Sequence, residues 1–160
     1  MMVALAALTI SACAPDRAKI AAAAMDEGRT FLAANAKAPG VVTLPSGLQY
    51  KVVKSGPSDG VKPRRGDEVK VNYEGKLISG KIFDSSYERG VPAALPLDAL
   101  VPGWIEALQL MRPGDEWILY VPSNLAYGEN GAGDIPPGST LIFKIELLGV
   151  LPGPGHAAQG

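Results

Sequence analysis

From residue 41 onward, apolar and polar residues alternate, and this alternation constrains the fold more than any other feature of the sequence. In EVKVNYEGKL, Val69, Val71, Tyr73 and Leu77 share one face, and polar or charged residues occupy the other. Strict alternation is typical of a strand with one buried face. The segments DEWILYVP and TLIFKIELLGV are apolar on nearly both faces, which indicates central strands.

Only one segment of this region has convincing helical spacing. Pro102 suits the first position of a helix, because its missing N–H would have no partner within the helix there. Trp104, Ala107, Leu108 and Met111 follow at helical intervals, and the Pro-Gly pair after Met111 ends the segment. We therefore expect an α+β domain, with an antiparallel sheet of about five strands and one short α-helix against its apolar face.

The composition excludes several classes of function. Hydrophobic residues make up 47 % of the 160 residues, which is enough for one core. The net charge of -1 lacks the basic excess that a nucleic-acid partner requires. Cys13 and His156 are the only residues of their kinds, so the sequence offers no disulfide framework, zinc site or hydrolytic triad. No cofactor is expected.

The N-terminus resembles an export signal. Residues 2–12 form an apolar run that is too short to span a bilayer and fits the apolar core of a secretory signal. The tetrad ISAC resembles a bacterial lipobox, and lipid on Cys13 would anchor the protein to a membrane. No basic residue precedes Arg17, however, so a buried apolar helix with an incidental cysteine stays an alternative.

Residues 13–40 are rich in Ala and charged residues and predict a helical spacer. The helix is expected from about residue 16 to residue 38, with Gly28 as a candidate interruption. Ile20, Ala24, Phe31 and Leu32 form only a thin apolar stripe. Both a spacer and a helix that docks a partner are compatible with this pattern.

Aromatic and aliphatic residues spread over five segments are the remaining candidates for a site, although each alone is more often part of a core. Asp84 directly follows Phe83 in a short apolar stretch, so its carboxylate should need a hydrogen-bond partner, and the tyrosine hydroxyls are the obvious candidates. The acidic residues Asp67 and Asp115 each follow a glycine at the start of a strand and are expected to be solvated charges.

Three long segments carry a family resemblance. VNYEGKLISGKIFDSSYERG, LVPGWIEALQLMRPGDEWILYVPSNLAYGE and IPPGSTLIFKIELLGV resemble the FKBP-type peptidyl-prolyl cis–trans isomerases, above all the Mip-like members of the bacterial envelope. The resemblance covers about residues 44–150 and implies a curved sheet wrapped around the helix, with a macrolide-binding pocket between them. It gives an isomerase domain at 41–151, after a signal-like segment at 1–12, and a flexible tail at 152–160.

The resemblance also implies roles for individual residues. Trp104 corresponds to the floor of the pocket. The walls of the pocket correspond to Tyr73, Phe83 and Phe143. An aliphatic lip corresponds to Leu100 and Val101, and the Val101 N–H donates a hydrogen bond to a ligand carbonyl. Ile135 corresponds to an aliphatic residue of the final loop. Asp84 and Tyr127 correspond to the two polar groups at the rim and are the candidate catalytic residues. Ala93 departs from an aromatic residue that many members carry, so that edge of the pocket should be more open.

The implied activity is rotation of X-Pro bonds in exported proteins of the bacterial cell envelope, with proline-containing polypeptides and macrolides as ligands. One alternative is a peptide-binding chaperone module that keeps the pocket but has little turnover, and another is a structural lipoprotein with a vestigial pocket. Envelope relatives often dimerise through a long helical region. Only about 25 residues are available for that here, which favours a monomer.

Overall fold

The computed structural model describes residues 16–154. The signal-like segment, Cys13 and His156 lie outside the described residues. Three α-helices and seven strands form in the part that is described. The helices are α1 (Arg17–Asn35), α2 (Ser86–Arg89) and α3 (Pro102–Leu108). The strands are β1 (Val41–Thr43), β2 (Gln49–Lys54), β3 (Glu68–Leu77), β4 (Ile82–Ser85), β5 (Ala93–Pro96), β6 (Glu116–Val121) and β7 (Leu141–Leu151).

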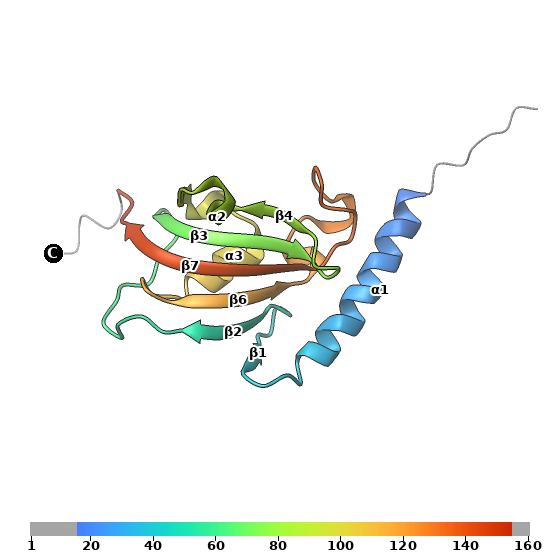
Figure 1. The fold of residues 1–160 in the computed structure, drawn as a ribbon, viewed down its shortest axis with the longest axis horizontal. Coiled ribbons are helices and arrows are strands. Elements are labelled where there is room, and N and C mark those ends of the chain that lie inside the picture. The colour runs from blue at the N-terminus through green and yellow to red at the C-terminus, as the bar shows by residue number, and fades with distance from the viewer. Residues whose placement is uncertain (1–15, 155–160) are drawn as a thin grey trace, which may run out of the picture.

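All strands belong to one antiparallel sheet in the order β1-β2-β6-β7-β3-β4, with β5 also paired to β3. The sheet curves in front of α3 in Figure 1. The predicted α+β class is therefore confirmed, but the sheet has seven strands rather than about five. The additional strands include β1, β4 and β5, which span three or four residues each and are too short to show a clear period in sequence.

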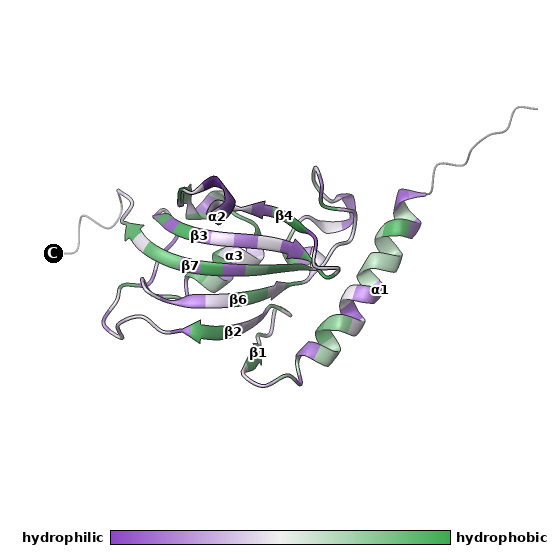
Figure 2. Ribbon diagram, viewed as in Figure 1, coloured by the Kyte–Doolittle hydropathy of each residue, from purple (hydrophilic) through white to green (hydrophobic). Residues whose placement is uncertain are grey.

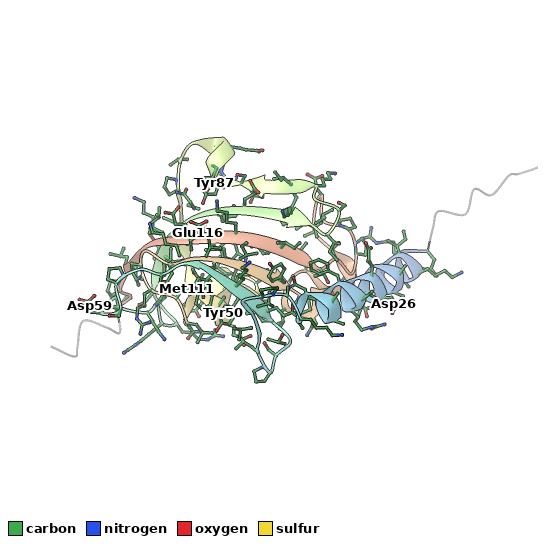
Figure 3. The ribbon with its side chains drawn as sticks, turned by 60° about the horizontal axis from the view of Figure 1, so that its bottom comes forward. Asp26, Tyr50, Asp59, Tyr87, Met111 and Glu116 are labelled. Atoms are coloured by element: carbon green, nitrogen blue, oxygen red, sulfur yellow. The ribbon has the colours of Figure 1, made fainter. Side chains whose placement is uncertain are left out.

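The core lies between α3 and the face of the sheet that the alternation predicted to be buried. Val69 and Val71 of β3 are fully buried, whereas Lys70 between them is exposed. Ala107 and Leu108 of α3 are fully buried against this face. The helix ends three residues before Met111, whose side chain is nonetheless buried in the same core (Figure 3).

Asp67 and Asp115 correct one expectation, because both are buried rather than solvated. Asp115 accepts hydrogen bonds from the backbone N–H groups of Gly56 and Arg112, at 2.6 and 2.9 Å. Asp67 accepts equivalent bonds from Arg64 and Gly153, at 2.7 and 2.9 Å. Each carboxylate closes the turn before its strand and ties it to a distant segment, which a local reading of the sequence does not reveal.

Helix α1 is continuous through Gly28 and ends at Asn35, slightly before the expected end at residue 38. Asp16 caps its start by accepting a hydrogen bond from Ala18 N–H. The helix lies at one end of the sheet, beside the loop that precedes β7 (Figure 1). Hydrophobic and hydrophilic residues alternate in bands along it (Figure 2), and no helix between residues 16 and 154 has the length and apolar character needed to cross a membrane.

Candidate functional site

A cavity of about 270 Å³ opens where the start of α3 meets β3, β4 and β7. Eight of the nine residues predicted for the pocket line it, together with Leu95 and Ala99, which the sequence did not single out. The eight are Tyr73, Phe83, Asp84, Leu100, Val101, Trp104, Tyr127 and Phe143. Ile135 is the exception, because its side chain is buried in the hydrophobic core and is not part of the lining.

The aromatic rings of the cavity stand at right angles to one another. Trp104 is only 4 % exposed, and its indole meets the rings of Tyr73 and Phe143 edge to face, each at 5.2 Å between centroids. Phe83 meets Phe143 in the same way at 5.7 Å. Edge-to-face contacts fix each ring against its neighbour. The result is a rigid apolar enclosure.

The start of α3 brings Trp104 into the lining of this enclosure. Pro102 occupies the first turn as expected, and the Val101 carbonyl accepts hydrogen bonds from Trp104 N–H and Ile105 N–H at 3.0 and 3.1 Å. The Trp104 Nε1–H is buried and has no hydrogen-bond partner within residues 16–154. The indole N–H is therefore a donor that the described protein leaves unused.

Gly75 makes room for the aromatic walls and was not predicted as a site residue. It pairs with Phe143 across β3 and β7. A Cβ atom at this position would lie 2.6 Å from Cζ of Phe83 and 2.8 Å from Cε1 of Phe143. A glycine inside an otherwise alternating strand was the available signal, because such a residue often marks a close approach of another group.

The rim of the cavity carries a connected polar group made of Tyr73, Asp84 and Arg89. The Tyr73 hydroxyl donates to Asp84 Oδ2 at 2.5 Å, which confirms that a tyrosine satisfies this carboxylate. Arg89, in the last turn of α2, pairs with Asp84 Oδ1 and donates to the Tyr73 hydroxyl at 3.0 Å. Its guanidinium carbon lies 5.5 Å from the centroid of the Tyr73 ring. Sequence reasoning missed Arg89, because its role depends on where α2 turns.

These contacts set the protonation of the rim. Partial burial alone would raise the pKa of Asp84, but the hydrogen bonds from Tyr73 and Arg89 and the charge of Arg89 outweigh it, and the pKa lies below its usual value. Burial raises the pKa of Tyr73, and its hydrogen bond to Asp84 raises it further. At neutral pH the rim therefore holds a carboxylate and a protonated phenol, and neither is poised to transfer a proton.

Besides the Trp104 indole, two donors at the edge of the cavity have no partner in the described protein. Tyr127 is 42 % exposed, and its hydroxyl has no hydrogen bond to any residue between 16 and 154. The backbone N–H of Val101, just before α3, likewise has no backbone acceptor in that range. An apolar enclosure with two unused donors at its edge can hold a compact apolar ring whose neighbouring carbonyl groups accept hydrogen bonds.

A sheet curved around one short helix, with an aromatic cavity at the start of that helix, defines an FKBP-like protein. The family model described as FKBP-type peptidyl-prolyl cis-trans isomerase matches residues 60–148, and one for the domain amino terminal to it matches residues 3–52. The chain belongs to the FKBP-type peptidyl-prolyl cis-trans isomerase family, and its resemblance to Mip-like members is confirmed.

Particular relatives are similar over most of this chain. It is 55 % identical over 126 residues to the peptidyl-prolyl cis-trans isomerase Mip of Coxiella burnetii, covering 78 % of this chain and 54 % of that protein. It is 50 % identical over 125 residues to the outer membrane protein MIP of Legionella longbeachae, covering 78 % and 53 %. The crystal structure of FkpA from Escherichia coli matches with a TM-score of 0.82 and 45 % identity, covering 86 % of this chain and 64 % of that one. The chain thus spans about half the length of these two curated relatives.

Proposed function

We propose that this protein is a peptidyl-prolyl cis–trans isomerase that binds proline in the cavity above Trp104. The observation that carries the proposal is the enclosure of perpendicular aromatic rings with unused donors at its edge. Rotation about an X-Pro bond is opposed by a barrier of roughly 20 kcal/mol that arises from amide resonance. No covalent bond is made or broken, so the reaction requires neither a nucleophile nor a cofactor.

An apolar enclosure suits this reaction because the planar amide is more polar than the twisted one. Surroundings of low polarity disfavour the planar ground state relative to the twisted transition state, and only such differential binding accelerates the step. We assign Trp104 to the floor under the proline ring. The walls are Tyr73, Phe83 and Phe143, and the lip is Leu100 and Val101. Ile135 supports the final loop from within the core.

Within this proposal, Tyr127 donates its hydroxyl to a substrate carbonyl, and Val101 N–H donates to a second carbonyl. Asp84 orients the Tyr73 hydroxyl together with Arg89, and its negative charge shapes the field at the rotating carbonyl. General-base catalysis by Asp84 is not part of the mechanism, because the reaction transfers no proton.

The competing function is a peptide-binding chaperone module that keeps the cavity but turns over little. An isomerisation assay on a short X-Pro peptide, with and without a rapamycin-type macrolide, separates the two. We expect the purified protein to accelerate the exchange and the macrolide to suppress it. Binding of the macrolide without any acceleration would favour the chaperone module, and absence of both would leave only a structural role.

We further propose that the protein acts on exported polypeptides in the bacterial cell envelope, attached to a membrane through lipid on Cys13. The ISAC tetrad and the relative named an outer membrane protein support this location. Mass spectrometry of the protein from an envelope fraction tests it. A lipid-modified N-terminal Cys13 is the expected result, and an unmodified Cys13 in the intact protein would contradict the anchor.

A further inference from the structure

Helix α1 is packed against its own domain along one face. Its buried and partly buried residues recur at helical spacing and include Ala21, Ala24, Met25, Gly28, Phe31 and Leu32. Ala22, Ala23 and Ala33, on other sides of the helix, are exposed. The stripe differs from the predicted one, because Ile20 is 37 % exposed and Gly28 takes part in the contact. A helix that served only as a spacer would not need such a continuous contact.

The surface that α1 covers is the loop of residues 127–140, called here the rim loop, which begins with Tyr127. Gly28 touches the end of this loop so closely that a Cβ atom there would collide with Thr140 Oγ1 and lie 3.2 Å from Thr140 Cβ. Gly138, at a φ of +73°, approaches the Ala21 backbone in the same way, since a Cβ atom added there would lie 3.0 Å from the Ala21 carbonyl carbon. At the start of α1, the Arg17 guanidinium donates to the Asn130 carbonyl at 2.9 Å.

The other end of α1 is fixed to the sheet. The Gln49 side chain in β2 donates to the Leu32 carbonyl and accepts from the Asn35 amide, both at 2.8 Å. Phe31 contacts the Tyr120 ring of β6 at 6.1 Å between centroids. Because α1 is held at both ends, its middle cannot easily move away from the rim loop.

The rim loop transmits this contact towards the cavity through its own hydrogen bonds. Gly138 N–H donates to the Gly128 carbonyl at 2.9 Å, which links the segment touching α1 to the residue after Tyr127. Ala132 and Ile135 exchange two backbone hydrogen bonds of 3.0 and 2.8 Å, and the Ile135 side chain is buried in the core. A displacement at residues 138–140 therefore shifts the backbone that carries Tyr127.

We propose that α1 is a positioning element for the site: the tight contact of Gly28 with Thr140 holds the rim loop so that the Tyr127 hydroxyl stays at the edge of the cavity. The effect on turnover rests on the proposed function, whereas the effect on the rim loop does not. Gly28 is a positioning residue, since it acts through the loop and touches no substrate.

The test is Gly28→Ala in the intact protein, with amide hydrogen exchange and isomerase kinetics as the two measurements. The added methyl group should push Thr140 and the rim loop away from α1, speed exchange at rim-loop amides, and lower kcat by about fivefold with a smaller change in KM. Thr140→Ala removes the Oγ1 atom, so the double variant should regain slow exchange and most of the turnover. Ala23→Val adds bulk to the exposed side of α1 and should change neither measurement.

If rim-loop amides of the Gly28→Ala variant exchange hydrogen as slowly as those of the wild-type protein, the proposal is overturned, whether or not the protein is an isomerase. Failure of Thr140→Ala to rescue the variant would overturn it as well. If the wild-type protein shows no turnover while Gly28→Ala still loosens the rim loop, the proposed function fails and the positioning stands. Arg17→Ala, which removes only the bond to Asn130, provides a milder variant if Gly28→Ala does not fold, and should speed exchange near residues 128–131.

Discussion

The indole of Trp104 meets the ring of Phe143 edge to face, with 5.2 Å between the centroids and 90° between the planes. The first residue comes from the start of α3 and the second from β7, so this contact joins the helix to the sheet at the cavity. Because both side chains are almost fully buried, the contact belongs to the core and to the site at once.

Trp104→Ala should therefore abolish macrolide binding and also lower stability. The loss of a buried tryptophan costs about 3–5 kcal/mol. Trp117→Ala is the matched control, because Trp117 is also buried but does not line the cavity and stacks on Tyr50, at 4.2 Å between ring centroids. Urea unfolding and macrolide titration should show two destabilised variants, of which only the Trp117 variant still binds. A folded Trp104 variant with wild-type affinity would exclude Trp104 as the floor.

Gly75→Ala should weaken ligand binding although it replaces none of the residues that line the cavity. The added methyl group would displace the Phe83 and Phe143 rings, since it would lie 2.6 to 2.8 Å from their atoms. Gly149→Ala in β7 is the control, because no atom lies within 4 Å of a Cβ there. We expect macrolide affinity to fall about tenfold or more for Gly75→Ala, since overpacking costs about 1–3 kcal/mol. Equal affinities for the two variants would contradict this reading of the walls.

Tyr127→Phe should reduce turnover more than stability. The hydroxyl makes no hydrogen bond to the described protein, so its removal should change the free energy of unfolding by less than about 0.5 kcal/mol. Loss of one hydrogen bond in the transition state should lower kcat/KM about tenfold. Tyr87→Phe, at a similarly exposed tyrosine of α2, should leave kcat/KM unchanged (Figure 3). The reverse pattern, lost stability with full turnover, would make the Tyr127 hydroxyl structural.

The pH dependence of stability should contain a contribution from Asp84. Its pKa is lower in the folded protein than the ordinary value of 3.8, so the folded state gains stability above that pH. This gain is lost as the pH falls through 3.8 towards the lower folded pKa. The carboxylate is 40 % exposed, so solvent screening should keep the effect below about 1 kcal/mol.

Urea unfolding of wild type and Asp84→Asn between pH 6 and pH 2 measures this contribution. The difference between their unfolding free energies should shrink as the pH falls below about 4. The hydrogen bond from Tyr73 lowers the pKa of Asp84, and the hydrogen bond and charge of Arg89 lower it further, so Arg89→Met should reduce the same pH dependence without abolishing it. A difference between wild type and Asp84→Asn that stays constant with pH would refute the assignment.

The parts of the site that could be predicted are those whose evidence is local. Trp104 follows Pro102 at helical spacing, and Asp84 follows an aromatic residue in a short apolar stretch, so both stand out in the sequence. Arg89 could not be found in this way, because its contact with Asp84 depends on the path of α2 after β4. The burial of Asp67 and Asp115 was mispredicted for a similar reason: each accepts a hydrogen bond from a residue far away in the chain.

The pairing of Gly75 with Phe143 has a consequence for how the protein comes to be active. Two of the cavity walls, Tyr73 on β3 and Phe143 on β7, lie on paired strands that are separated by nearly half the chain, and long-range pairing of this kind slows folding. During synthesis, β3 must wait for β7 before any proline could be enclosed, because β7 lies between β3 and β6 in the sheet. A nascent chain whose residue 143 is still inside the ribosome lacks the central strand β7 and the Phe143 wall of the cavity. On the proposed function, this catalyst of a slow folding step can act only after its own long-range pairing of β3 with β7 is complete.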